Sequence, residues 1–218
     1  MRSTVAVVDY GMGNLRSVAK AIEHVAPGDR VLVTASATEI ADADRVVVPG
    51  QGAMPDCMRE LELRGLRQAV VRAAADKPFL GICIGLQMLF GQAEEGGAMG
   101  LEVLPGRVPH FPREAMLGAD GSRLKVPHMG WNEVHHMAGE SGKPHPLWTD
   151  IADGARFYFV HSYYVEPELP DVIAGSTHYG IPFTSAVARD NIFAVQFHPE
   201  KSARDGLALL ANFMRWKP

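Results

Sequence analysis

The chain has 218 residues, of which 47% are hydrophobic and 21% are charged. Because this composition supplies a sizeable core, we expect a single globular domain over residues 1–218, with room for at most one large insertion. The formal net charge is −4 and no dense run of lysine or arginine occurs, so the sequence argues against a nucleic-acid-binding surface.

The chain contains only two cysteines, Cys57 and Cys83. A single disulfide would be an unusual way to stabilise a chain of this length, so we expect a reducing, cytoplasmic location. No run approaches the roughly 18 apolar residues that a membrane-spanning helix needs. The first residues also turn acidic at Asp9, and we therefore expect neither a signal peptide nor a membrane segment.

Short apolar runs alternate with helical patterns in the first part of the chain, as they do in βα units. We expect strands at 4–8, 30–34, 45–48 and 78–82, a helix at 14–24 and helical segments over 54–75. This order predicts a mainly parallel sheet with helices on both faces. Ligands of such sheets bind at the carboxyl ends of the strands.

The second part of the chain has a different pattern. Glycine, proline and histidine are frequent from 91 to 143, where we expect loops and short antiparallel strands. Further strands are expected at 156–160, 172–176, 184–188 and 192–197, and a last helix at 205–216 with Leu207, Leu210, Ala211 and Met214 on its apolar face. The complete prediction is an α/β fold with an open, mixed and mainly parallel sheet.

A cysteine flanked by glycines ends the strand expected at 78–82. In Gly81-Ile82-Cys83-Ile84-Gly85 the two glycines permit a tight strand-to-helix turn that lifts the cysteine above the sheet. The backbone N–H of Ile84 would then face a reacting carbonyl at the start of the following helix, which also favours a thiolate. The alternative is a buried cysteine that merely ends a core strand.

A cysteine nucleophile needs a base, and His198 stands out among the nine histidines. It follows the strand expected at 192–197 in the run His198-Pro199-Glu200. Because proline keeps its predecessor extended, residues 198 and 200 are expected on the same side, where the carboxylate can orient the imidazole. The alternative is a strand end with a turn-forming proline and solvated charges.

A glycine-rich loop follows the strand expected at 45–48. Its residues Gly50, Gln51 and Gly52 could approach a substrate closely and supply a second oxyanion donor beside Ile84. Taken alone, such a loop is only a turn.

Together these elements resemble the class I glutamine amidotransferases, in which Gly-x-Cys-x-Gly-x-Gln and His-Pro-Glu carry a Cys-His-Glu triad. The resemblance implies that Cys83 attacks the side-chain amide of glutamine and that His198 protonates the departing ammonia. A glutamyl thioester then remains, and water activated by His198 releases glutamate. The resemblance further implies a set of residues that hold the substrate: Gly52, Gln87, Glu95, His161 and Ser162.

Three further segments are similar to the family of glutaminase subunits of imidazole glycerol phosphate synthase. They are Asp9-Tyr10-Gly11-Met12-Gly13-Asn14-Leu15, Pro127-His128-Met129-Gly130-Trp131-Asn132 and Phe157-Tyr158-Phe159-Val160-His161-Ser162-Tyr163-Tyr164. The family implies a (β/α)8-barrel cyclase partner that receives ammonia through an internal passage and makes imidazole glycerol phosphate and an aminoimidazole carboxamide ribotide. It also implies a docking face that includes Asn14, Trp131, Asn132 and Lys201.

Gln51 departs from the family pattern, because its position in the oxyanion loop more often holds a small apolar residue such as valine. The identity of the N–H that completes the oxyanion hole is therefore left open.

The remaining histidines and the second cysteine suggest no further chemistry. His135, His136 and His145 lack the cysteines or carboxylate spacing of a closed metal site, so we expect no metal and no cofactor. Cys57 is expected to be a spectator thiol. Two alternative functions stay open: an amidotransferase for another acceptor or a free-standing glutamyl hydrolase, and a silent binding protein that keeps the fold without turnover.

Overall fold

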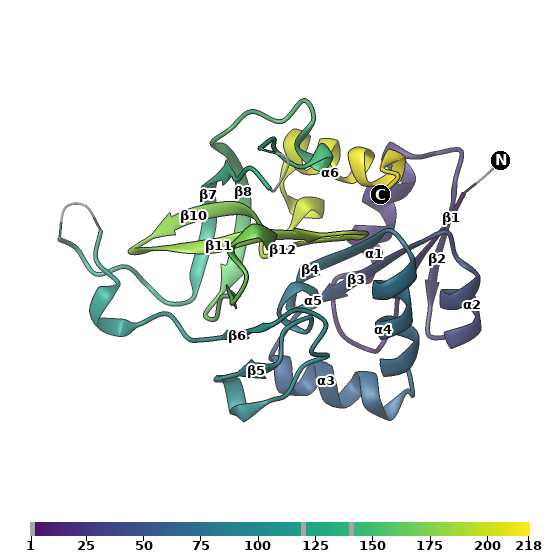
Figure 1. The fold of residues 1–218 in the computed structure, drawn as a ribbon, viewed down its shortest axis with the longest axis horizontal. Coiled ribbons are helices and arrows are strands. Elements are labelled where there is room, and N and C mark those ends of the chain that lie inside the picture. Colours follow the sequence, from purple (N-terminus) through teal and green to yellow (C-terminus); the bar gives the residue numbers. More distant parts are fainter. Residues whose placement is uncertain (1–2, 119–120, 140–141) are drawn as a thin grey trace.

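A nine-stranded sheet forms the centre of the computed structural model, which describes residues 3–118, 121–139 and 142–218 (Figure 1). The strand order is β2-β1-β3-β4-β12-β11-β10-β7-β8. The strands are β1 (Thr4–Val8), β2 (Arg30–Thr34), β3 (Arg45–Gly50), β4 (Phe79–Cys83), β7 (His128–His136), β8 (Ala155–His161), β10 (Ile173–Tyr179), β11 (Ile181–Arg189) and β12 (Ile192–Val195). A small second sheet contains β5 (Gln92–Ala93), β6 (Gly106–Val108) and β9 (Glu166–Pro167).

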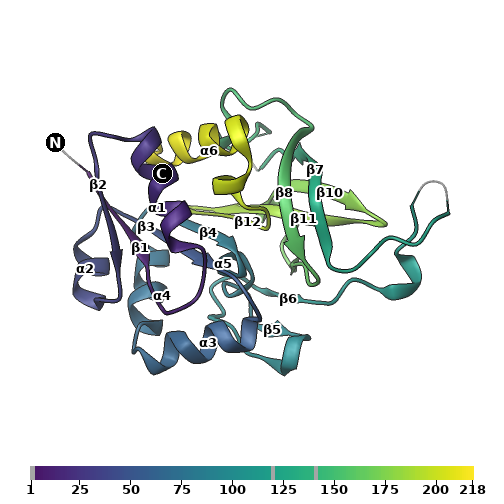
Figure 2. The same ribbon diagram turned by 180° about the vertical axis from the view of Figure 1, so that it is seen from behind.

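Helices cover both faces of the parallel part of the sheet. Helices α1 and α6 lie together on one face, and α2, α3 and α4 lie on the other (Figures 1 and 2). The helices are α1 (Leu15–Val25), α2 (Ala37–Asp42), α3 (Met54–Leu63), α4 (Arg67–Asp76), α5 (Ile84–Gln87) and α6 (Ala203–Arg215). The predicted α/β class, with a mixed sheet and helices on both faces, is confirmed.

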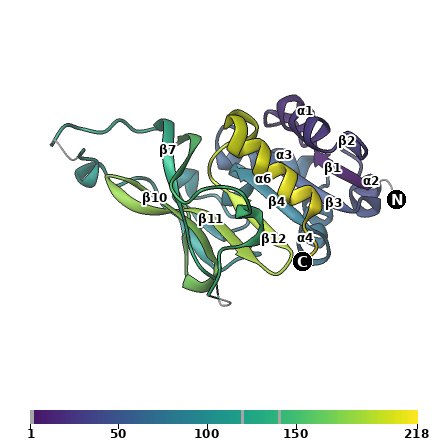
Figure 3. The same cartoon turned by 90° about the horizontal axis from the view of Figure 1, so that it is seen from above.

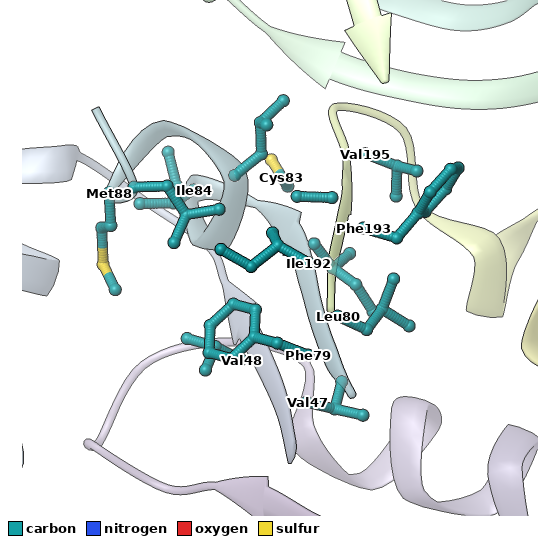
Figure 4. Packing of buried hydrophobic residues seen from close by; sticks show 14 of the residues in the cluster. Val47, Val48, Phe79, Leu80, Cys83, Ile84, Met88, Ile192, Phe193 and Val195 are labelled. Atoms are coloured by element: carbon teal, nitrogen blue, oxygen red, sulfur yellow. The ribbon is translucent and has the colours of Figure 1, made fainter. Parts of the chain in front are cut away.

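The five strands from β2 to β12 are parallel, and the four from β11 to β8 are antiparallel. Every residue of β3, β4 and β12 is buried, as expected for strands covered by helices on both sides. Their side chains form one apolar cluster, in which Val48, Leu80 and Phe193 come from the three neighbouring strands (Figure 4). Cys83 lies at the end of this cluster, where β4 meets α5.

The helical segments predicted at 54–75 are two helices, α3 and α4. The break between α3 and α4 contains Gly65, whose φ of +67° is left-handed and ends a right-handed helix. Helix α2, which was not predicted, is too short to show a period, but Ser36 caps it by accepting a bond from the N–H of Glu39 at 3.3 Å.

The segment predicted to hold loops and short antiparallel strands contains the nine-residue strand β7. This strand pairs along its length with β8, and only two of its nine residues are buried. Because so few side chains are buried on either side of β7, the sequence lacks the apolar alternation that marks a half-buried strand. Strand β7 is antiparallel to β8 and β10, and the short strand β6 is antiparallel to β9, as expected, whereas β5 and β6 pair in parallel.

Helix α6 is present as predicted, but its buried face is rotated by one residue. Leu210 and Met214 are buried as predicted, together with Leu209 and Phe213, whereas Leu207 and Ala211 are only half-buried. Seen from above, α6 runs across the parallel strands beside α1, so its contact surface faces both the sheet and that helix (Figure 3). The helical period alone does not determine which α6 side chains pack against the sheet and which pack against α1.

Membrane-spanning helices and metal clusters are both absent from the described part of the chain. No helix among residues 3–118, 121–139 and 142–218 is long and apolar enough to cross a membrane. Within the same ranges no group of three or more histidine, cysteine, aspartate or glutamate side chains is arranged to hold a metal ion.

The backbone of α5 lies directly against the end of β3. A Cβ atom added to Gly85 would lie 1.9 Å from the carbonyl oxygen of Val48, and this neighbour is backbone that has no room to move. The helix that follows Cys83 can therefore occupy this position only with glycine at 85.

We expect Gly85→Ala to lower the free energy of unfolding by about 3 kcal/mol or more, because the new methyl group overlaps a backbone atom in a packed core. Urea denaturation followed by circular dichroism measures this change. The matched control is Gly28→Ala, since no atom lies within 4 Å of a Cβ at that exposed position. Equal stability of the two variants would show that a side chain at 85 does not collide with the carbonyl oxygen of Val48.

Three histidines lie against aromatic rings: His128 and His161, which are buried and contact each other, and the half-buried His145, which contacts Phe193 and Trp216. His128 stacks on Phe159 and Tyr179, with ring centroids 4.9 and 4.0 Å away, and lies 3.0 Å from His161 between Nδ1 and Nε2. Burial lowers the pKa of His128 and His145 to about 4, and that of His161 to about 3. These imidazoles are therefore neutral near neutral pH.

We expect the free energy of unfolding to fall by several kcal/mol between about pH 6.5 and pH 4. The ordinary pKa of histidine is 6.5, so over this range the three side chains bind protons in the unfolded chain. In the folded protein their lowered pKa values keep them neutral. The stability that they contribute is thus complete above the unfolded pKa and is lost as the pH falls. Urea denaturation at a series of pH values measures the slope of the free energy of unfolding against pH.

His145→Gln should flatten this slope, because one of the three proton uptakes disappears. His24→Gln is the control, since His24 is exposed on α1. If the slope of the His145 variant equalled that of the control, the neutral state of His145 would be disproved.

Candidate active site

Cys83 occupies a strained turn between β4 and α5. Its φ of +56° and ψ of −109° are left-handed values that cost energy for a residue with a side chain. The flanking glycines make the turn possible, because a Cβ at Gly81 would lie 2.7 Å from the carbonyl oxygen of Gly85. The geometry is that of a nucleophile elbow, as the glycine spacing predicted.

The glycine-rich loop lies beside this turn. Gly50 pairs with Cys83 in the register of β3 and β4, and a Cβ at Gly50 would lie 2.5 Å from the Cβ of Ile84. Gly52 has a φ of +104°, which glycine alone adopts readily. The predicted oxyanion loop and the backbone around Ile84 are therefore brought together.

Two side chains bind the carbonyl groups of this loop from the core. The hydroxyl of Tyr10 donates to the carbonyl oxygen of Pro49 at 2.7 Å. The thiol of Cys57 lies 3.7 Å from the carbonyl oxygen of Gln51 and donates to it. Burial raises the pKa of Cys57 to about 11, so this thiol keeps its proton. Cys57, predicted to be a spectator, thus has a contact with the loop.

His198 and Glu200 form a buried pair. Nδ1 of His198 lies 3.0 Å from Oε1 of Glu200, and the two side chains are 2% and 1% exposed. The His198 backbone is held by its N–H, which donates to the carbonyl oxygen of Tyr158 at 2.9 Å. The hydroxyl of Ser202 donates to the carbonyl oxygen of His198 at 2.6 Å. The predicted orientation of residues 198 and 200 toward the same side is present.

The charge of His198 is controlled by its acidic neighbours. Burial by itself would lower the pKa of this imidazole, but interactions with Cys83 and Glu200 outweigh burial and raise the pKa. Because Nδ1 is bonded to Glu200, Nε2 is the ring nitrogen left for the sulfur. Nε2 is buried and has no hydrogen-bond partner among the described residues.

A cavity of about 320 Å³ joins these groups. Nine of the predicted site residues line it: Gln51, Gly52, Cys83, Ile84, Gln87, Glu95, His161, Ser162 and His198. The other two predicted site residues adjoin it: Glu200 contacts His198, and Gly50 pairs with Cys83. The residues come from segments far apart in the sequence, and their convergence is what a substrate site requires.

Two of the predicted substrate-binding side chains already make internal hydrogen bonds. Nε2 of Gln87 donates to the carbonyl oxygen of Tyr163 at 3.2 Å and to Oε1 of Gln196 at 3.0 Å. Oε1 of Gln87 is buried without a partner among the described residues. Oε2 of Glu95 accepts the N–H of Met54 at 2.7 Å, which fixes this carboxylate at the start of α3.

Sequence reasoning missed Gln196. This residue is fully buried, and its Nε2 lies 3.7 Å from Sγ of Cys83. The two-residue alternation that relates 198 to 200 extends back to 196, so the sequence did contain a signal for it.

The four residues predicted for a docking face differ in their surroundings. Trp131 is 50% exposed and packs edge-on against Tyr158, with ring centroids 6.3 Å apart. Nζ of Lys201 lies 5.9 Å from the centre of the Tyr158 ring. Asn14 begins α1 without forming a side-chain cap.

The amide of Asn132, in contrast, is used internally. Its Nδ2 donates to the carbonyl oxygen of His178 at 2.9 Å and lies 3.3 Å from Nε2 of His128. The histidines considered for a metal also have other partners: His135 lies 3.3 Å from Asp153, and His136 stacks on Trp148.

The fold resembles solved structures at low sequence identity. The structure of PurLQS from Thermotoga maritima superimposes with a TM-score of 0.65 and 15% identity, covering 99% of each chain. The glutaminase domain of Trypanosoma brucei CTPS gives a TM-score of 0.61 and 17% identity, covering 99% of this chain and 95% of that one. These similarities concern the fold alone.

Sequence comparisons are far more specific. Residues 6–216 match the family described as glutamine amidotransferase class-I. "Imidazole glycerol phosphate synthase subunit HisH" of Aromatoleum aromaticum is 66% identical, over 99% of this chain and all of its own length. The protein of the same name from Dechloromonas aromatica is 65% identical, over 99% of this chain and 97% of its own. The chain therefore belongs to the class I glutamine amidotransferases, within the family of HisH subunits of imidazole glycerol phosphate synthase.

Proposed function

We propose that this chain hydrolyses glutamine with Cys83 as nucleophile, His198 as general acid and base, and Glu200 as the group that orients His198. The observation that carries the proposal is the buried His198–Glu200 pair beside a strained cysteine at the wall of a cavity. A raised His198 pKa favours an imidazolium next to a thiolate, which is the reactive form of such a pair.

In the proposed reaction the Cys83 thiolate attacks the side-chain amide carbon of glutamine. The N–H of Ile84 and an N–H of the Gly50–Gly52 loop, at Gln51 or Gly52, stabilise the oxyanion. His198 gives its proton to the leaving nitrogen, so the C–N bond breaks, ammonia leaves and a glutamyl thioester remains. His198 then takes a proton from water, whose oxygen attacks the thioester and releases glutamate together with the thiolate.

The cavity supplies groups for the rest of the substrate. The buried Oε1 of Gln87 has no partner among the described residues, and it suits an N–H of glutamine because an unpaired buried oxygen is costly. The carboxylate of Glu95 suits the ammonium group of the substrate. His161, Ser162 and the backbone at Gly52 line the same cavity and complete the proposed substrate site.

We further propose that the ammonia passes to a (β/α)8-barrel cyclase partner. That partner would form imidazole glycerol phosphate and an aminoimidazole carboxamide ribotide in histidine biosynthesis. The relatives carry the name of a synthase subunit, which supports this assignment. The chain would act as one domain, residues 1–218, in the cytoplasm.

Exposed apolar side chains mark the proposed docking face. Met129 and Trp131 on β7 are 62% and 50% exposed, and Leu117 in the preceding loop is 50% exposed. All three border one surface hollow of about 420 Å³. We assign the half-buried Asn14 and Lys201 to the same face, and Asn132 contributes indirectly by holding this end of β7 to His178.

We expect Cys83→Ser to reduce glutamate release from glutamine by at least about a thousandfold, because a serine hydroxyl beside His198 is a far weaker nucleophile than a thiolate. Glutamate release is measured for the chain alone and with the cyclase in the presence of its ribonucleotide. The wild-type chain should turn over slowly alone and much faster in the complex. The variant should still bind the cyclase and support synthesis from added ammonia.

Gln68→Ala, an exposed change on α4, is the control and should keep wild-type activity. Fast wild-type turnover that the cyclase leaves unchanged would favour a free-standing hydrolase or another acceptor. Undiminished glutamate release by the Cys83 variant would reject the mechanism, and a wild-type chain inactive in every mixture would favour a silent binding protein.

Trp131→Ala should weaken binding of the cyclase by about tenfold or more, because a half-exposed aromatic ring is a typical anchor of an interface. Isothermal titration calorimetry measures the affinity. Leu63→Ala is the control, since Leu63 is also exposed, at 74%, but lies on α3 away from the proposed face. Equal affinity of both variants would remove Trp131 from the docking face.

A further inference from the structure

A buried carboxamide outside the proposed triad contacts the nucleophile. Gln196 follows β12 directly and precedes His198 by two residues. Its backbone N–H donates to the carbonyl oxygen of Ser185 at 2.9 Å, which ties this position to β11. Nε2 of its side chain lies 3.7 Å from Sγ of Cys83, within hydrogen-bonding distance for sulfur.

The orientation of this carboxamide follows from a backbone carbonyl two hydrogen bonds away. The oxygen of Tyr163 can only accept, so the Gln87 atom 3.2 Å from it is the NH₂ group. The same NH₂ lies 3.0 Å from the side chain of Gln196, so the Gln196 atom that faces it is the carbonyl Oε1. The NH₂ group of Gln196 is thereby directed to the sulfur of Cys83.

A reversed carboxamide would be unfavourable at both of its ends. It would place two donors together at Gln87 and would present an oxygen lone pair to the negative sulfur of a Cys83 thiolate. Because Gln196 is 0% exposed, water is not available to compensate the lost hydrogen bond. The chain of contacts from Tyr163 through Gln87 therefore selects a single orientation.

We propose that Gln196 is a further catalytic residue, which donates an N–H to the Cys83 thiolate and stabilises it. A hydrogen bond to the charged form of an acid favours that form. Gln87 acts as a positioning residue, since it holds the carboxamide in the donating orientation. This role is additional to its contact with the substrate.

The amide complements His198 chemically. In the proposed reaction His198 gives up its proton, so its attraction for the sulfur varies during the cycle. An amide N–H does not ionise and remains a donor throughout. Gln196 thus favours the thiolate both as the attacking group and as the group released from the thioester.

The test measures the thiolate directly. Alkylation of Cys83 by iodoacetamide is followed between about pH 5 and pH 9, because only the thiolate reacts. Mass spectrometry quantifies the peptide that carries Cys83. Cys57 does not interfere, since burial raises its pKa to about 11.

In Gln196→Met, which keeps the side-chain length but lacks the N–H, the midpoint of the alkylation profile should rise by about one pH unit. Gln196→Asn, whose shorter side chain withdraws the amide from the sulfur, should show the same rise and serves if the methionine variant fails to fold. An unchanged midpoint in either folded variant would overturn the proposal.

The matched control is Asn212→Leu. Asn212 is also a buried amide, but its Nδ2 donates to the carbonyl oxygens of Leu147 and Thr149 and makes no contact with Cys83. This variant should lose stability while the alkylation midpoint stays in place. A rise equal to that of the Gln196 variants would mean that lost stability, rather than the lost N–H, causes the effect.

The kinetic consequence rests on the proposed function. In the cyclase complex, Gln196→Met should lower kcat for glutamate release about tenfold or more and change KM less than about threefold. The alkylation profile needs no turnover, so the role of Gln196 can be rejected independently of the proposed function. A wild-type chain without glutaminase activity would count against the proposed function, whereas only an unmoved midpoint would count against the role of Gln196.

Discussion

The close approach of the α5 backbone to the end of β3 is the constraint on which the site depends. Side chains are excluded at Gly50, Gly81 and Gly85, where a Cβ would lie within 2.7 Å of another atom. Only with this space empty can the chain reverse within one residue and place Cys83 at a φ of +56°. Such a conformation costs roughly 1–3 kcal/mol, which the fully buried strands on either side offset. The strain is thus maintained by the core rather than by the site itself.

The sheet order explains why three distant segments meet at this turn. Strands β3, β4 and β12 are neighbours and parallel, although β12 follows β4 by more than a hundred residues in the chain. Their carboxyl ends therefore lie at one edge, with the glycine-rich loop, Cys83 and His198 side by side. Antiparallel pairing of β12 with β4 would have sent His198 to the opposite edge. The parallel direction of this one pair is therefore essential for the proposed chemistry.

The parts predicted correctly from sequence depend on local rules. Glycine spacing indicates the turn at Cys83, and two-residue alternation places His198 and Glu200 on one side. The parts missed depend on distant contacts. Strand β7 has too few buried side chains to show a period, and the face of α6 depends on α1 as well as the sheet. The orientation of Gln196 depends on the carbonyl of Tyr163, a group that every residue possesses and that no sequence pattern reveals.

The site also holds a neutral and a positively charged histidine within one core. His198 and His161 both line the cavity and both are almost completely buried, yet their pKa values move in opposite directions. Burial disfavours the charged form of each ring. Only His198 has a carboxylate and a thiol against it, whereas His161 is bonded to the carbonyl oxygen of Tyr163 and to another imidazole. The fold thus produces a positive charge next to Cys83 because it places acidic groups against His198 and not against His161.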